Sequence, residues 1–295
     1  MTTEARTIAS GYAFLEAPRW RDGFLYVSDI FGREVLKFTE DGQAERICEV
    51  SSRPSGLAWD ANGNLLVSSM GDQRVLRLQD GDLEVFADLS GTVRGDVNDM
   101  ISDGHGGVYL GSFGFGPAED LVPTQLVHIS EDGTVTTAAD DLVFPNGMAI
   151  TPDGRTLLVA ETFASRISAF DITAPGHLIN RRDWAAFQET PEIVQPAAVG
   201  SKVFVAPDGI CLDAEGCLWV ADPRGNAALR VAPGGQVVDD IKINSANLSV
   251  FAVALGGEDK KTLYMCAGPK MGSDVNLEIE RQSELLAVKV NVPGA

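Results

Sequence analysis

The stretch VAPDGICLDAEGCLWVAD, residues 205–222, decides the fold because the chain repeats it. It is typical of a hairpin, with a short apolar strand over residues 209–212, a turn over 213–216, and a second strand over 217–221 that ends at Asp222. The same pattern recurs in five further stretches, at residues 16–29, 55–69, 98–112, 146–161 and, more faintly, 250–267. Six copies of one hairpin predict a closed ring.

The spacing of the copies is that of propeller blades. A repeat of roughly 40 to 50 residues with four strands per unit is typical of a β-propeller. We therefore predict an all-β, six-bladed β-propeller that forms one domain over residues 1–295, with an open β-sandwich as the alternative. A strand at residues 6–10 is expected to complete the last blade. The copies start at positions 16, 55, 98, 146, 208 and 250.

Composition narrows the classes of partner. The formal net charge is −19 at pH 7, whereas nucleic acid is held by clustered Lys and Arg, so we expect no nucleic-acid partner. The N-terminal segment lacks the apolar core of a signal peptide, and no apolar run is long enough to span a bilayer. We expect a cytoplasmic monomer or homodimer that makes no membrane contact and acts on a small-molecule substrate. Its four cysteines are expected to be free thiols.

One repeat position gathers polar side chains. The residue that opens the innermost strand of a blade lies at the mouth of the central channel, so equivalent residues of all blades form a ring there. Buried polar groups at a narrow mouth require ordered water or a cation. The ring is predicted to hold Glu16, Ser55, Asn98, Asn146, Asp208 and Val250.

Carboxylate and amide oxygens without histidine suit a hard cation. We predict one divalent ion, Ca²⁺ first, with Zn²⁺ or Mn²⁺ as alternatives. The predicted oxygen donors are two carboxylates and two amides, namely Glu16, Asn98, Asn146 and Asp208. Asn-Gly and Asp-Gly dipeptides are also common turn residues, and it is the shared repeat position that favours the metal interpretation.

Apolar residues follow the returning strands, another precedes the Asn146 turn, and together they are predicted to wall a pocket at the same mouth. A Gly- and Pro-rich insertion at residues 113–123 lies there as well, where it would serve as a lid or as a subunit contact. The carboxylates and hydroxyls that end the returning strands are expected mainly to cap the blades. The predicted wall comprises Phe31, Met70, Phe113, Phe144 and Phe163.

Several other chemistries lack support. None of the three histidines occupies the mouth, so the sequence does not indicate a Ser-His-Asp arrangement. A Gly-rich phosphate loop before a helix is also missing.

An ordered set of motifs runs along nearly the whole chain, and it resembles the senescence marker protein, gluconolactonase and luciferin-regenerating enzyme family. The motifs are Glu16-Ala-Pro, Asn98-Asp99, Pro145-Asn146-Gly147, and Pro207-Asp208-Gly209 followed by Leu-Trp-Val-Ala-Asp. The resemblance implies a calcium-dependent, six-bladed propeller hydrolase. It also implies that Glu16, Asn146 and Asp208 are metal ligands and that Asn98 contacts substrate or water.

One departure from the family pattern concerns specificity. Sugar-lactonase members usually show Arg-Pro-Asn-Asp where this chain has Asp96-Val97-Asn98-Asp99. An acid at Asp96 therefore replaces the arginine that the resemblance assigns to substrate hydroxyls. With the phenylalanines, this predicts a substrate less polar than a sugar acid lactone.

The sequence thus predicts a hydrolase that opens a lactone or a related cyclic ester. The cation would polarise the carbonyl, while a water attacks after Asp208 or Asp99 helps to remove its proton. Two alternatives stay open. In the first, the same ion would serve other chemistry, namely organophosphate hydrolysis, non-hydrolytic ring opening or isomerisation. In the second, the chain would be a non-enzymatic ligand-binding propeller with a structural ion.

Overall fold

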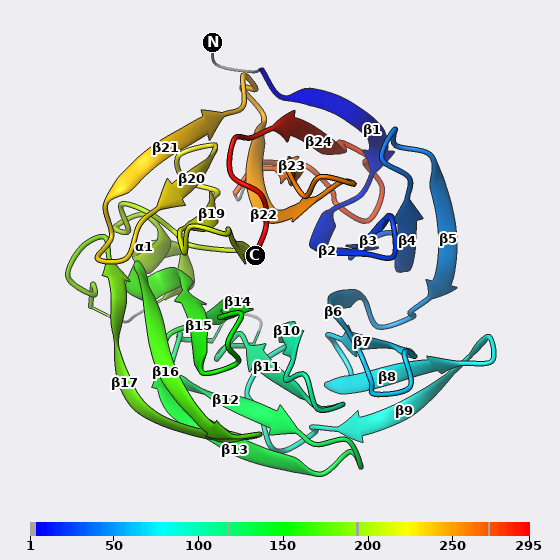
Figure 1. The fold of residues 1–295 in the computed structure, drawn as a ribbon, viewed down its shortest axis with the longest axis vertical. Coiled ribbons are helices and arrows are strands. Elements are labelled where there is room, and N and C mark those ends of the chain that lie inside the picture. Colours follow the sequence, from blue (N-terminus) through cyan, green and yellow to red (C-terminus); the bar gives the residue numbers. More distant parts are fainter. Residues whose placement is uncertain (1–3, 117–118, 193–194, 271) are drawn as a thin grey trace.

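The fold is a ring of six antiparallel sheets. The computed structural model describes residues 4–116, 119–192, 195–270 and 272–295. Each sheet has four strands, and the sheets follow one another around a central axis (Figure 1). The six-bladed β-propeller predicted from the hairpin repeat is confirmed, and the β-sandwich alternative is wrong.

Five blades are built from four consecutive strands that pair in chain order from the axis outward. The first two blades are β2 (Leu15–Arg21), β3 (Phe24–Asp29), β4 (Glu34–Phe38) and β5 (Ala44–Glu49), then β6 (Pro54–Trp59), β7 (Leu65–Ser69), β8 (Arg74–Gln79) and β9 (Asp82–Asp88). The next two are β10 (Val97–Ser102), β11 (Val108–Ser112), β12 (Thr124–Ile129) and β13 (Val135–Leu142), then β14 (Pro145–Ile150), β15 (Thr156–Glu161), β16 (Arg166–Ala174) and β17 (His177–Ala186). The fifth is β18 (Ile210–Leu212), β19 (Leu218–Asp222), β20 (Ala227–Val231) and β21 (Val237–Lys242).

The sixth blade joins the two ends of the ring. Its inner strands are β22 (Leu248–Gly256), β23 (Thr262–Pro269) and β24 (Ser283–Lys289), and its outermost strand is β1 (Arg6–Tyr12). Arg6 pairs with Ala287 and Tyr12 with Ser283. The predicted completion of the last blade by the first strand is therefore confirmed, and this pairing covers an edge that would otherwise expose unpaired backbone groups.

Apolar side chains of neighbouring blades pack against each other, which holds the ring together. Between the sixth and first blades, Leu25 and Phe38 share one buried cluster with Tyr264. Trp20 stacks on Tyr264 with ring centroids 5.6 Å apart. A Cβ atom at Gly256 would lie 2.5 Å from Trp20, so only glycine allows this approach.

Among the described residues, helical structure is confined to two short segments, α1 (Pro196–Gly200) and η1 (Thr162–Ala164). Val199 of α1 and Ala164 of η1 belong to one buried apolar cluster. Within the part of the chain that the structure describes, neither segment approaches the length and apolarity of a membrane-spanning helix. The 113–123 insertion and the 188–204 connection each contain residues outside the described set, so a lid function of the insertion stays a prediction.

Candidate metal centre at one mouth of the channel

The strand register sets four polar side chains at one level of the channel. The inner and returning strands begin pairing at Leu15 with Asp29, Pro54 with Ser69, Val97 with Ser112, and Pro145 with Glu161. The next residue of each inner strand therefore occupies the same place in its blade. These residues are Glu16, Ser55, Asn98 and Asn146. In the fifth blade, the pairing of Ile210 with Val220 places Asp208, two residues before Ile210, at the same level.

The sixth position of this ring differs from the predicted one. Val250 pairs with Ala267 at the level of the first pair of the other blades, and a one-residue irregularity follows it. The residue in the ring is therefore Phe251, so the prediction of Val250 is wrong. Val250 instead packs in the core between the fifth and sixth blades, while Phe251 packs with Phe14 and Met70.

The ring and the layer below it concentrate buried negative charge. Glu16, Asn98, Asn146 and Asp208 are each less than a tenth exposed. Burial, then the nearby charge of Asp99, raises the pKa of Glu16 to about 8. Burial, followed by the charges of Glu16 and Asp99, raises the pKa of Asp208 well above its ordinary value. These effects show that the three carboxylates share one poorly solvated space.

Asp99 stands out because its repeat position otherwise carries small residues. The equivalents in neighbouring blades include Gly56 and Gly147, where an added Cβ would lie 2.4 Å from Met100 N and 2.5 Å from Asp208 O, respectively. Asp99 is 2% exposed, and its Oδ1 has no hydrogen-bond partner among the described residues. A buried carboxylate oxygen without a donor is costly, which favours a cation or ordered water beside it.

Hydrogen bonds orient the two amides. Asn146 Nδ2 donates to Thr162 Oγ1 at 3.1 Å, and Thr162 Oγ1 donates to Pro207 O at 2.9 Å. Ser55 Oγ donates to Asn98 Oδ1 at 3.3 Å. Fixing the Asn146 amide nitrogen in this way leaves its oxygen available as a ligand.

The donor set fits a hard divalent cation. Among the described residues, no three His, Cys, Asp or Glu side chains are grouped to hold a metal unaided. A cation in this ring would therefore need the amide oxygens as well as the carboxylates, an all-oxygen combination that suits Ca²⁺. The unpartnered Oδ1 of Asp99 is the observation that supports the fit.

The carboxylates that end the returning strands hold the segments before the inner strands. Asp29 accepts hydrogen bonds from the backbone N–H groups of Ala13 and Phe14, and Glu161 accepts one from Val143. Asp222 accepts one from Ala206. They shape the mouth by capping blades, which is the role expected of most of them.

Aromatic rings wall one side of the mouth. Phe113 and Phe144 meet edge to face at 4.7 Å, and Phe144 stacks on Phe163 at 5.2 Å. Phe115 joins this group 5.9 Å from Phe144. Sequence reasoning missed Phe115, although the Phe-Gly-Phe-Gly run of the insertion places it two residues after Phe113.

The other two predicted wall residues lie in a second apolar group. Phe31 and Met70 pack with Phe14 and Phe251. The rings of Phe14 and Phe251 have centroids 4.7 Å apart. Phe14 and Phe144 occupy equivalent positions, because each backbone oxygen accepts a hydrogen bond from the residue after its returning strand.

Comparison with known proteins adds to this geometry. Residues 14–268 match the SMP-30/gluconolactonase/LRE-like region family. The chain belongs to this family. The resemblance noted from the sequence motifs is therefore confirmed, and it extends over most of the propeller.

Relatives of this SMP-30/gluconolactonase-family chain include named lactonases. A 6-deoxy-6-sulfogluconolactonase from Pseudomonas putida is 31% identical over 173 residues, which span 58% of this chain and 54% of that protein. A pentonolactonase from Haloferax volcanii is 26% identical over 265 residues, or 89% of this chain and 84% of that protein. A calcium-binding regucalcin from Agrobacterium tumefaciens has the same fold, with a TM-score of 0.79, 18% identity, and coverage of 99% of this chain and 96% of that one.

This SMP-30/gluconolactonase-family chain carries an ion pair at the rim of the mouth. Asp96 Oδ2 accepts a hydrogen bond from Arg53 Nη2 at 2.7 Å, with both side chains about 30% exposed. The two residues precede Ser55 and Asn98 by the same two positions, in adjacent blades. Sequence reasoning placed Asp96 at the mouth and missed Arg53, because the two residues are 43 positions apart.

Proposed function

We propose that the chain is a divalent-metal-dependent hydrolase that opens a lactone or a related cyclic ester. The observation that carries this proposal is that three buried carboxylates, Glu16, Asp99 and Asp208, lie near enough for their charges to act on one another, beside amide oxygens and an aromatic wall. The lactonase names of two relatives support the reaction class. The calcium-binding neighbour supports a divalent cation of this kind.

Glu16, Asn146 and Asp208 would hold the cation, with Asn98 beside them. When bound, a divalent cation would supply Lewis-acid polarisation of the ester carbonyl. Oxygen donors favour Ca²⁺, with Zn²⁺ or Mn²⁺ as alternatives. Burial keeps bulk water from screening these charges, which strengthens each electrostatic interaction.

The residues of the mouth would also move protons and orient the ester. The Asn98 amide nitrogen would donate to an oxygen of the substrate. As a water oxygen forms a bond to the carbonyl carbon, Asp208 would accept a proton from that water, with Asp99 as the nearby acid able to share it. The bond from the carbonyl carbon to the ring oxygen then breaks, and the same proton passes to that oxygen, giving a hydroxy acid.

The rim favours a substrate less polar than a sugar acid lactone. Phe113, Phe144 and Phe163 present aromatic surface at the mouth. The Arg53 guanidinium is already paired with Asp96, so fewer of its N–H groups are free to bind substrate hydroxyls. An aliphatic or aromatic lactone would bury apolar area against the rings at about 25 cal/mol per Å².

Proton release, followed with a pH indicator, tests the proposal on a panel of sugar, aliphatic and aromatic lactones. We expect chelation to remove turnover and Ca²⁺ to restore it. Asp208→Asn should lower kcat by about 10²- to 10⁴-fold. Asp153→Asn is the matched control. Asp153 also stands between a proline and a glycine, as Asp208 does, but it lies on an exposed turn.

The outcomes separate the alternatives. Retained turnover in Asp208→Asn would remove that carboxylate from the reaction. A bound cation with silence across the whole panel would instead indicate organophosphate hydrolysis, a non-hydrolytic ring opening or isomerisation, or a ligand-binding propeller with a structural ion.

A further inference from the structure

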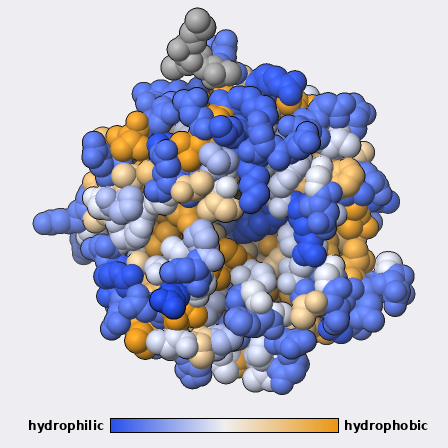
Figure 2. Space-filling model, in the orientation of Figure 1, coloured by the Kyte–Doolittle hydropathy of each residue, from blue (hydrophilic) through white to orange (hydrophobic). Residues whose placement is uncertain are grey.

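A second cavity opens on the face opposite the metal mouth. It lies where the inner strands end, and its volume is about 400 Å³. Figure 2 shows this face hollowed near its centre, around the axis of the ring. A volume of this size lies in the range of small-molecule sites. The cavity is walled by Trp20, Trp59, Ile101, Ile150, Leu212 and Leu255.

The charged side chains lining this cavity are all cationic. They are Arg19 and Lys260, and no described Asp or Glu side chain is among the lining residues. This contrasts with a chain whose formal net charge is −19. Lys260 Nζ lies at the edge and donates to a carboxylate oxygen of Ala295, the last residue of the chain, at 3.4 Å. Lys260 is therefore engaged with an anion that also lines the cavity, and Arg19 is the cation available inside.

Arg19 differs in kind from the residues at the equivalent position of the other blades. It pairs with Tyr26 at the level where the other inner strands pair Ala58 with Leu66 and Ala254 with Tyr264. The equivalent residues of the remaining blades are Ile101, Ala149 and Cys211. One guanidinium thus stands on a ring that is otherwise made of small or apolar side chains.

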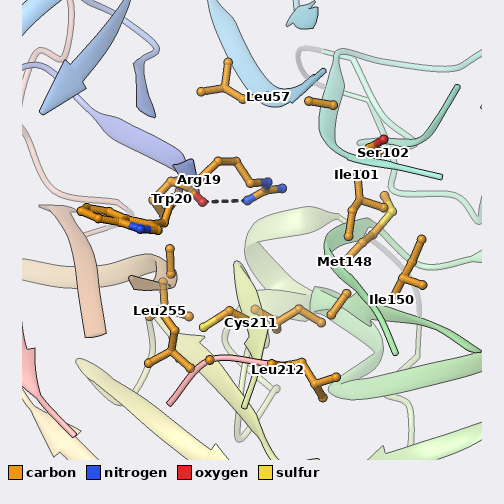
Figure 3. Close-up of a pocket in the computed structure, with 18 of the residues that line it drawn as sticks. Arg19, Trp20, Leu57, Ile101, Ser102, Met148, Ile150, Cys211, Leu212 and Leu255 are labelled. Carbon is orange, nitrogen blue, oxygen red and sulfur yellow. Dashed lines mark hydrogen bonds between the residues drawn. The ribbon is translucent and has the colours of Figure 1, made fainter. Parts of the chain in front are cut away.

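The Arg19 guanidinium is incompletely bonded. Nη1 donates to Pro18 O and Nη2 to Met100 O, each at 2.9 Å. A guanidinium has five N–H donors, and in the described part of the chain no carboxylate lies within 4.0 Å of Arg19. Figure 3 shows the side chain extending across the cavity toward Ile101. Because Arg19 is only partly buried, its remaining donors stay available to a ligand in the cavity.

We propose that this cavity binds a small amphipathic carboxylate. The carboxylate would take the free N–H donors of Arg19, in the paired geometry that suits a guanidinium. The apolar chain would lie against Trp59, Ile150 and Leu255. Burial raises the pKa values of Glu16 and Asp99, and the nearby charge of Arg19 offsets part of this rise, so the guanidinium lies within electrostatic range of both acids. This site is independent of the proposed hydrolysis.

Octanoate is a suitable probe, and 1-octanol and octylamine are matched probes without the negative charge. Binding is followed by calorimetry and by tryptophan fluorescence, because Trp20 and Trp59 line the cavity. We expect octanoate to bind more tightly than either matched probe. A charged hydrogen bond contributes about 1.5–3 kcal/mol, so Arg19→Met should weaken octanoate binding about tenfold or more. The same substitution should leave octanol binding unchanged.

Further variants distinguish this site from the metal mouth. Ile150→Trp fills the cavity while Arg19 stays in place, and it should weaken both octanoate and octanol. Lys260→Met should change octanoate affinity less than threefold, because that lysine is already engaged. Asp208→Asn should leave octanoate binding intact, with Ca²⁺ or with chelator.

Three results would overturn the proposal. They are no octanoate binding, equal affinity for octanoate and octanol, and unchanged octanoate binding in a folded Arg19→Met protein. Octanoate binding that is lost in Asp208→Asn and kept in Ile150→Trp would place the ligand at the metal mouth and overturn it as well. Lactonase assays on the same variants report the proposed function separately.

Discussion

The buried carboxylates at the metal mouth should make the cation-free protein less stable as pH rises. Burial raises the pKa of Glu16 from its ordinary 4.5 to about 8 in the folded state. Between these values the folded state holds a proton that the unfolded state has released. The free energy of unfolding therefore falls with increasing pH through this window.

The size of the effect follows from the two pKa values. One pKa unit corresponds to about 1.4 kcal/mol, so the difference for Glu16 sets an upper limit of about 5 kcal/mol. Asp208 and Asp99 act in the same direction. For a protein of this size about 1 kcal/mol corresponds to about 2 °C in Tm, so Glu16 alone should lower Tm by up to about 10 °C from pH 5 to pH 8.5.

Thermal unfolding by circular dichroism, in chelator and at constant ionic strength, measures this slope. Glu16→Gln should make the slope smaller, because the amide carries no proton to lose in this range, while Asp208 and Asp99 still contribute. Glu258→Gln is the matched control, since Glu258 is exposed and lies outside the ring. At pH 8.5, Ca²⁺ at about 100 times its Kd should add about 2.7 kcal/mol to the wild type and much less to Glu16→Gln.

The reasoning fails if the cation-free wild type is equally stable at pH 5 and pH 8.5. It also fails if Glu16→Gln and Glu258→Gln show the same slope. Either result would mean that water solvates the ring well enough to keep its carboxylates ionised.

Three further predictions test the aromatic wall and the layer below the ring. Phe144→Ala should lower kcat/KM for an aromatic lactone about tenfold, since aromatic contacts contribute about 0.5–1.5 kcal/mol beyond their buried area. The same substitution should change kcat/KM for a sugar lactone little. Equal losses on both substrates would contradict a role of Phe144 in specificity. Gly147→Ala should lower the free energy of unfolding, measured in urea, by about 2–4 kcal/mol, because the added Cβ would lie 2.5 Å from Asp208 O. Gly200→Ala is the control, since its Cβ would make only an ordinary 3.5 Å contact. Asp99→Asn should weaken Ca²⁺ binding in calorimetry with the fold retained, and unchanged affinity would show that its unpartnered oxygen plays no part in holding the cation.

Sequence reasoning succeeded where structure repeats locally. The Gly-containing turns and apolar strands of residues 205–222 recur with enough regularity to predict both the blades and the strand that closes the ring. The same regularity placed Glu16, Asn98, Asn146 and Asp208 at one level of the channel. Their roles as ligands stay predictions.

Where the repeat breaks, sequence reasoning failed. The pairing of Val250 with Ala267 in β22 puts Phe251, one residue later, at the ring position, and the hydrophobic pattern does not reveal this because both residues are apolar. The pairing of Arg53 with Asp96 joins two blades and has no local signature. The sequence analysis assigned no role to Arg19, and only the register shows that alanines such as Ala58 and Ala254 occupy the equivalent positions.

The sequence by itself thus determined the kind of blade, the number of blades and the polar character of one ring, because strand pattern and turn chemistry act over a few residues. Only the tertiary structure decided what meets across the axis. Closing the ring brings residues such as Glu16 and Asp208 into one buried space, where the loss of solvent raises their pKa values and makes their charges act on each other. The same closure sets Arg19 between that acidic ring and an apolar cavity, and this arrangement depends on register and packing that no short stretch of sequence encodes.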